Sequence, residues 1–235
     1  MEIDYSEIKV IGFDADDTLW VNETYFRDAE IEFAKLLSKY ETVNKIDQEL
    51  FKKEIENLPL YGYGVKAFTL SMIESALELS NYNISNKIIE SILNIGKDML
   101  NKPVELLDGV EDVLKRVSKK YRLILATKGD LLDQEEKLKK SGLTDYFHHI
   151  EVLSDKKESN YSKLLNHLDI NPSEFLMIGN SLKSDILPLV NLNAHAIHVP
   201  FHTTWAHEQV TEEETNGKTY KTIKSLKEVL NLLNC

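Results

Sequence analysis

A short apolar run that ends in three acidic residues constrains the fold of this chain more than any other feature. Residues 9–20 read Lys-Val-Ile-Gly-Phe-Asp-Ala-Asp-Asp-Thr-Leu-Trp. The β-branched apolar stretch before Asp14 predicts a strand that is buried on both faces. Carboxylates this close cannot all ionise cheaply in a protein interior, so Asp14, Asp16 and Asp17 need a cation, hydrogen-bond donors or solvent beside them. The carboxyl end of a buried parallel strand, where open α/β sheets bind ligands, is such a place.

The same residues also fit a simpler interpretation. Asp and Thr are favoured in turns and at helix N-termini, so Asp-Ala-Asp-Asp-Thr could do no more than cap the next helix. If the acids instead form a site, one of Asp14 and Asp16 could act as a nucleophile while the other transfers protons. The rest of the chain decides between these two interpretations.

The overall composition limits the class of protein and its partners. The 235 residues are 42% hydrophobic and 29% charged, which is typical of a soluble globular protein, and the formal net charge of −11 argues against nucleic-acid and anionic-membrane partners. A phosphorylated metabolite would need a metal ion and local lysines to reverse the sign of the field. The only cysteine is Cys235, and no segment reads as a signal peptide or a membrane span, so we expect a cytoplasmic protein. The sequence leaves the oligomeric state open.

Periodicity divides the chain into a helical part and an alternating part. After Trp20 the pattern is helical for about eighty residues. From Val104 onward, strands alternate with helices, which predicts an α/β fold with a mostly parallel sheet covered on both faces. Helices are expected over 25–40, 47–57 (with Pro59 at or just beyond its end), a segment ending near Leu79, 85–99, 109–119, 131–141 and 159–168, and later strands over 121–127, 149–153, 175–178 and, as the last strand, 194–199.

Polar residues follow each of the later strands. Thr127, with Lys128 beside it, ends the second strand and could bind an anion. The third strand leads to Lys156 and Lys157, and one of these ammonium groups could neutralise both a carboxylate and a bound phosphoryl group. Lys156 is preferred because it follows the strand more closely. The fourth strand ends in residues 179–185, Gly-Asn-Ser-Leu-Lys-Ser-Asp. Parallel neighbours bring all these strand ends to one edge of the sheet.

The residue types at these strand ends predict a metal and a reaction. Oxygen ligands from Asp14 and Asp185, without His or Cys companions, are typical of a hard cation, and magnesium fits best. A metal ion held by few carboxylates beside a lysine and a threonine is the equipment for phosphoryl transfer.

These motifs, in this order, resemble the haloacid dehalogenase superfamily of hydrolases that form an aspartyl phosphate. The resemblance covers residues 13–18, residues 123–127, a lysine at 156 or 157, and residues 179–185. It implies a Rossmann-like catalytic core of residues 1–19 and 103–235. It also identifies residues 20–102 as a helical cap that is inserted after the first strand.

The resemblance also implies a role for each residue. Asp14 would attack phosphorus, and Asp16 would protonate the leaving group and then deprotonate the hydrolytic water. Asp14, Asp185 and the Asp16 carbonyl would hold magnesium. Because the dehalogenase branch lacks an acid at position 16, Asp16 favours a phosphatase. Two residues depart from the family pattern: Asp17 replaces the usual glycine, and Asn180 replaces an acid found in many members, so Asn180 would bind the metal directly or through water.

Several smaller signals have two interpretations. Tyr63 and Lys66, near two glycines of the insertion, could contact substrate, or they could be a packing residue and a solvated one. Residues 203–208 could buttress the site, without an assigned mechanism, and the charged run 135–140 is most simply a solvated face. The favoured function is a magnesium-dependent phosphatase of a small phosphorylated metabolite, such as a nucleoside monophosphate or a sugar phosphate. A sugar-phosphate mutase, a phospho-accepting receiver module and a non-enzymatic scaffold are the alternatives.

Overall fold

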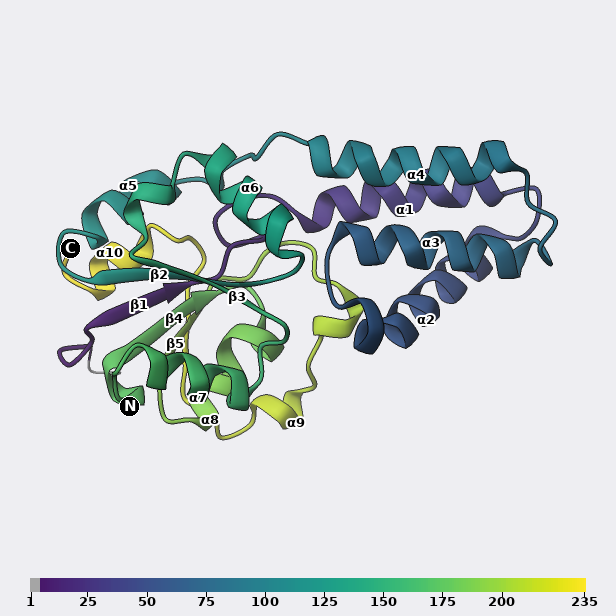
Figure 1. Cartoon of the computed structure of the whole chain (residues 1–235). Helices are drawn as coiled ribbons and strands as arrows, with labels where there is room; N and C mark the ends of the chain where they lie inside the picture. The colour runs from purple at the N-terminus through teal and green to yellow at the C-terminus, as the bar shows by residue number, and fades with distance from the viewer. Residues whose placement is uncertain (1–4) are drawn as a thin grey trace. The chain divides into compact units, whose positions relative to one another are not determined.

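The computed structural model describes residues 5–235, and this part of the chain divides into two compact units (Figure 1). The first unit contains residues 5–23, 104–128 and 136–235, and the second contains residues 24–103 and 129–135. The second unit differs from the expected insertion 20–102 at its boundaries, and it also takes in the segment after the second strand. That this unit acts as a substrate cap stays a prediction.

A six-stranded parallel sheet forms the centre of the first unit, with the strand order β3-β2-β1-β4-β5-β6. The predicted α/β, Rossmann-like class is therefore confirmed. The expectation that the strand at 194–199 is the last one is wrong, because β6 pairs with it. The two residues of β6 are exposed and polar, so no apolar pattern marks them. The strands are β1 (Val10–Phe13), β2 (Arg122–Lys128), β3 (His149–Leu153), β4 (Phe175–Gly179), β5 (His195–His198) and β6 (Lys221–Thr222).

Alternate residues of the strands feed two hydrophobic clusters, one on each face of the sheet. Ile11 and Phe13 belong to the cluster that packs against α5 and α10, whereas Val10 belongs to the cluster that packs against α7 and α8. The sheet is thus covered on both faces, as the nearly continuous apolar strands require. The helices of this unit are α5 (Val110–Val117), α6 (Leu131–Ser141, whose first turn belongs to the second unit), α7 (Glu158–His167), α8 (Leu187–Asn191), α9 (Glu212–Thr215) and α10 (Glu228–Leu232), with short helical turns at Thr144–Tyr146, Pro172–Glu174, Leu182–Ile186 and Ala206–Glu208.

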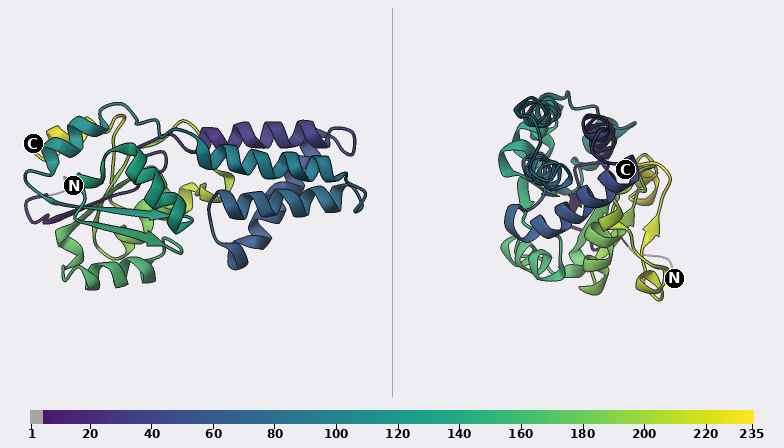
Figure 2. Two further views of the ribbon diagram at one scale, coloured as in Figure 1. Left: turned by 45° about the horizontal axis from the view of Figure 1, so that its top comes forward. Right: turned by 90° about the vertical axis from the view of Figure 1, so that its right-hand side faces the viewer.

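Helices alone form the second unit, which Figure 2 shows from two further directions. Its core is one hydrophobic cluster that includes Phe33, Leu50 and Met72. The expectation that the second helix ends by Pro59 is wrong, because this proline lies inside the helix, near its end. A proline there removes only one late hydrogen bond, and the helix continues to Tyr61. Gly62, whose φ of 71° is left-handed, follows as its C-cap. The helices are α1 (Glu23–Leu37), α2 (Val43–Tyr61), α3 (Val65–Leu79) and α4 (Asn86–Asn101).

Across residues 5–235, none of the helices combines the length and the hydrophobicity needed to cross a lipid bilayer.

Candidate active site

The register of the sheet brings the ends of β1, β2 and β4 together. Phe13, the last residue of β1, pairs with Leu125 of β2 and Ile178 of β4. The backbone N–H of Asp14 still donates to the carbonyl of Ile178, at 2.9 Å. The side chain of Asp14 therefore begins at the edge of the sheet where β2 and β4 also end.

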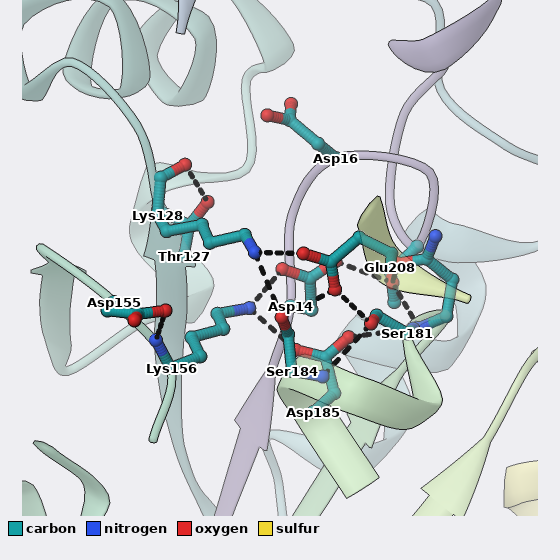
Figure 3. A network of polar contacts seen from close by, with 12 residues as sticks. Asp14, Asp16, Thr127, Lys128, Asp155, Lys156, Ser181, Ser184, Asp185 and Glu208 are labelled. Atoms are coloured by element: carbon teal, nitrogen blue, oxygen red, sulfur yellow. Dashed lines mark hydrogen bonds and ion pairs between the residues drawn. The ribbon is translucent and has the colours of Figure 1, made fainter. Parts of the chain in front are cut away.

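Lys156 joins the two acidic residues that the sequence places at this edge. Its Nζ donates to Asp14 Oδ1, and it lies 2.7 Å from Asp185 Oδ1 (Figure 3). The side chains of Lys156 and Asp185 are each 1% exposed and that of Asp14 is 7% exposed. Lys157 instead pairs with Asp155 and is 71% exposed. Of the two candidate lysines, the structure places Lys156 beside Asp14.

Burial and charge oppose one another in this cluster. Burial, together with the charge of Asp185, raises the pKa of Asp14 to about 7, although Lys156 acts in the opposite direction. Burial would lower the pKa of Lys156, but the carboxylates of Asp14 and Asp185 outweigh it and raise this pKa well above its ordinary value. Lys156 is therefore a permanent cation. A further positive charge nearby would favour the ionised form of Asp14.

Gly179 makes room for Asp185. A Cβ atom at position 179 would lie 2.4 Å from Asp185 Oδ2, which is far inside van der Waals contact. Oδ2 also accepts a hydrogen bond from the backbone N–H of Ser181, at 2.9 Å. The glycine that ends β4 thus lets the chain return over the strand and bring Asp185 to Lys156.

Thr18 connects Asp14 with Asn180. Its hydroxyl donates to Asp14 Oδ2 at 2.8 Å, lies 3.3 Å from Asn180 Oδ1, and accepts from the Asn180 backbone N–H at 3.0 Å. The amide oxygen of Asn180 is thus placed near the nucleophile candidate. Thr18 was not predicted to take part in the site, although it belongs to the first motif.

The donor set can be compared with what magnesium requires. Among residues 5–235, no group of three or more His, Cys, Asp or Glu side chains is arranged to hold a metal ion. Magnesium, however, binds through one or two carboxylates and completes its shell with water and substrate phosphate oxygens. Asp14 and Asn180 offer side-chain oxygens, and Lys156 holds Asp185 next to them. An all-oxygen set of this size fits magnesium and does not fit a soft metal.

Asp16 lies apart from this cluster. Its Oδ1 accepts hydrogen bonds from Trp20 Nε1 at 2.7 Å and from Lys137 Nζ at 3.1 Å. Lys137 also donates to Asn22 Oδ1 at 2.8 Å. Figure 3 shows the Asp16 carboxylate turned away from Asp14. The Asp16 side chain therefore lies outside the cluster of Asp14, Lys156 and Asp185.

The charged run 135–140 is therefore not simply a solvated face, as the sequence had suggested. Lys137 of this run is only 18% exposed, and its partner Asp16 lies 121 positions away. No local pattern separates Lys137 from the exposed lysines that follow it in α6.

The conformation of Asp17 explains why this position tolerates a residue other than glycine. Its φ of 61° is left-handed, a region that Asp and Asn adopt more readily than most residues. Its carboxylate accepts hydrogen bonds from the backbone N–H groups of Asn22 and Glu23 at the start of α1. Burial nevertheless raises the pKa of Asp17 to about 8. The helix-capping interpretation of the acidic cluster therefore holds for Asp17, and not for Asp14.

A second charged network lies at the end of β2. Thr127 is buried, and Lys128 pairs with Glu208, a residue that the sequence did not single out. Ser181 and Ser184 also donate to the Glu208 carboxylate (Figure 3). Burial would raise the pKa of Glu208, but Lys128 and the two hydroxyls lower it to about 2. The segment 203–208 thus contributes a permanent carboxylate to this edge of the sheet.

Tyr63 and Lys66 belong to the second unit. Lys66 Nζ donates to Asp130 Oδ1 at 2.8 Å, and Asp130 also lies in this unit. Both partners keep solvent contact, with side chains 51% and 27% exposed. Tyr63 is partly buried. Whether either residue contacts substrate stays a prediction.

Comparisons with known proteins identify the family. Residues 8–193 match the family model of haloacid dehalogenase-like hydrolases. N-acylneuraminate-9-phosphatase from Homo sapiens is 27% identical over an alignment of 192 residues that covers 77% of each chain. The structure of a haloacid dehalogenase-like family hydrolase from Xanthomonas campestris has a TM-score of 0.87 and 36% identity, and the match covers 97% of this chain and 91% of that one.

A more distant structure shows the fold alone. The putative HAD-hydrolase YfnB from Bacillus subtilis, in a magnesium-bound form, has a TM-score of 0.64 at 18% identity, with 97% of this chain and 99% of that chain covered. The family match also removes the receiver and scaffold alternatives, because it extends from β1 through the fourth motif. The chain therefore belongs to the haloacid dehalogenase-like hydrolase family.

Proposed function

We propose that this protein is a magnesium-dependent phosphatase that hydrolyses a small phosphomonoester through a covalent phosphate on Asp14. The observation that carries the proposal is the buried contact of Lys156 with both Asp14 and Asp185. This contact holds two carboxylates and a buried cation together at the strand ends where α/β sheets bind ligands, which supports Asp14 as the nucleophile. Phosphoryl transfer depends mainly on such positioning and charge stabilisation.

The chemistry follows from the order of Asp14 and Asp16. A carboxylate oxygen of Asp14 attacks phosphorus, the ester P–O bond breaks, and Asp16 gives a proton to the leaving oxygen. Asp16 then takes a proton from water, the resulting hydroxide attacks phosphorus, and the bond between phosphorus and Asp14 breaks. In the structure Asp16 is bonded to Trp20 and Lys137, so its side chain has to turn toward Asp14. Such rotations are fast compared with typical enzyme turnover.

Asp14, the Asp16 carbonyl, Asn180 and Asp185 are the groups that would hold magnesium. When bound, the ion would offset the charge of the phosphoryl oxygens and favour the ionised form of Asp14. Thr127, Lys128 and Lys156 are the proposed phosphate-binding residues. The net charge of −11 makes such local positive charge necessary for an anionic substrate.

The substrate class is a small phosphorylated metabolite. The curated relatives act, by their name, on the 9-phosphate of an N-acylneuraminate, so phosphorylated sugars are the first compounds to test. We propose that the second unit is a cap and that Tyr63 and Lys66 contribute to substrate choice from it. The segment that carries them contains Gly62 and Gly64, both with positive φ.

One screen tests the proposal. The purified chain is assayed for phosphate release from p-nitrophenyl phosphate and from a panel of sugar and nucleoside monophosphates that includes N-acetylneuraminate 9-phosphate. Each assay is run with magnesium and with a chelator, and Asp14→Asn serves as the inactive control. We expect hydrolysis that requires both magnesium and Asp14. Hydrolysis that survives exhaustive chelation, or turnover of haloacids without metal, would contradict the proposal.

A further inference from the structure

Glu208 reaches the site from outside the segment that defines the family. It lies in a helical turn (Ala206–Glu208) after β5, beyond the matched residues 8–193. Its side chain is 11% exposed, and that of its partner Lys128 is 16% exposed. A carboxylate and an ammonium this well covered are screened much less than a surface pair.

Two serines fix the direction of the Glu208 carboxylate. Oε2 accepts hydrogen bonds from the hydroxyls of Ser181 and Ser184, so Oε1 is left to meet Lys128 Nζ. Ser181 Oγ in turn accepts from the Ser184 backbone N–H at 3.0 Å, which directs its hydroxyl proton toward Glu208. The carboxylate is therefore held in place by the loop of the fourth motif.

Lys128 is held beside Glu208 and Ser184. Its Nζ donates to Ser184 Oγ at 2.9 Å as well as to Glu208, so these three residues form a closed triangle (Figure 3). Ser184 immediately precedes Asp185, whose carboxylate is joined to Asp14 through Lys156. The Lys128 ammonium therefore lies in the part of the unit where a phosphate attacked by Asp14 would have to bind.

Two anions can compete for the ammonium group of Lys128. A dianionic phosphate attracts it, and Glu208 is a permanent anion at its side. We propose that Glu208 is a positioning residue that competes with phosphate for the Lys128 ammonium, so that the inorganic phosphate product is held weakly and leaves readily. This proposal rests on the proposed phosphatase function, because it concerns the same anion site.

Competition for Lys128 and a purely structural role predict opposite changes in phosphate affinity when Glu208 is replaced. If Glu208 only held Lys128 in the correct place, its removal would weaken phosphate binding. If it competes, Glu208→Gln should strengthen binding, because the amide keeps the shape and the hydrogen bonds to the serines but loses the charge. The gain must also depend on Lys128, since the competition is for that one group.

The test is a double-mutant cycle on the full chain. The dissociation constant of inorganic phosphate is measured by calorimetry, in the presence of magnesium, for the wild type, Glu208→Gln, Lys128→Met and the double variant. We expect about tenfold tighter binding in Glu208→Gln and about tenfold weaker binding in Lys128→Met, the size of one coupled charge pair. The double variant should bind phosphate like Lys128→Met. In kinetics, Glu208→Gln should lower KM and the inhibition constant of phosphate without raising kcat.

Weaker phosphate binding in Glu208→Gln, or a gain that persists without Lys128, would overturn the inference. Should the Gln variant fail to fold, Glu208→Asp takes its place, because it keeps the charge but shortens its reach to Lys128 and should give a smaller gain of the same sign. If the wild type hydrolyses phosphate esters but the four phosphate dissociation constants do not follow the expected pattern, only the inference about Glu208 is refuted. If the dissociation constants follow the pattern but the wild type is inactive, only the phosphatase proposal is refuted.

Discussion

Replacing Lys156 by Met should destabilise the protein by an amount that depends strongly on pH. Methionine keeps most of the aliphatic volume but leaves Asp14 and Asp185 without their cation. These side chains are 7% and 1% exposed, so solvent cannot replace it. Removing one partner of a buried ion pair costs about 3–5 kcal/mol.

The pH dependence sets an independent limit on this cost. The pKa of Asp14 is already raised to about 7 beside Lys156, so the wild type already bears most of the protonation cost of Asp14, and the newly stranded carboxylate is that of Asp185. It escapes the penalty by taking up a proton, and for an unfolded pKa of about 3.9 this costs at most ~5 kcal/mol at pH 7.5 and ~1.5 kcal/mol at pH 5. The folded pKa of the stranded group is raised above the unfolded value, so stability is lost as the pH rises. We therefore expect a loss of about 3–5 kcal/mol at pH 7.5 that shrinks to about 1.5 kcal/mol or less at pH 5.

The assay is urea unfolding followed by tryptophan fluorescence. Both tryptophans, Trp20 and Trp205, belong to the first unit, so the signal reports on the unit that contains the site. Lys157→Met is the matched control, because Lys157 is 71% exposed and its pair with Asp155 should contribute about 1 kcal/mol or less. Equal effects of the two substitutions, or a loss in Lys156→Met that does not change between pH 5 and pH 7.5, would refute the buried cluster.

Three further predictions concern catalysis. Asp16→Asn should lower kcat toward an alkyl phosphate by about 10²–10⁴-fold, and by less toward p-nitrophenyl phosphate, whose leaving group needs little protonation; equal losses in steady-state assays would exclude a proton-transfer role. Asn180→Asp should lower the magnesium concentration for half-maximal activity, because a carboxylate adds charge beside Asp14, and an unchanged metal titration would place Asn180 outside the reach of the metal. Tyr63→Ala and Lys66→Ala should reorder the preferred substrates of a metabolite panel while the rate toward p-nitrophenyl phosphate changes little; an unaltered order in folded variants would leave Tyr63 as a packing residue and Lys66 as a solvated one.

The ends of the strands could be predicted from the sequence because each carries a local signal. A buried apolar run followed by an acid, a threonine or a glycine marks β1, β2 and β4, and parallel pairing then brings their ends together. Lys156 was preferred over Lys157 because it follows β3 more closely in the sequence. In the structure the side chain of Lys156 is buried and that of Lys157 is exposed. The two exposed residues of β6 carry no such signal.

The side-chain network around the strand ends could not be predicted in the same way. Glu208 meets Lys128 across 80 positions of the chain, and Lys137 meets Asp16 across 121. These contacts are set by tertiary packing, and Glu208 and Lys137 look locally like ordinary charged surface residues. The outward direction of Asp16 also depends on the Trp20 indole N–H, which composition and periodicity do not show.

The covalent phosphate on Asp14 is the central claim, and trapping it is the most direct measurement. The enzyme is mixed with magnesium and p-nitrophenyl phosphate, quenched in acid within one turnover, and treated with borohydride, which reduces an aspartyl phosphate to homoserine. Peptide mass spectrometry should then find homoserine at position 14 and unmodified aspartate at positions 16 and 17. Homoserine at another acidic residue, or none at position 14 while the enzyme turns over, would contradict nucleophilic attack by Asp14.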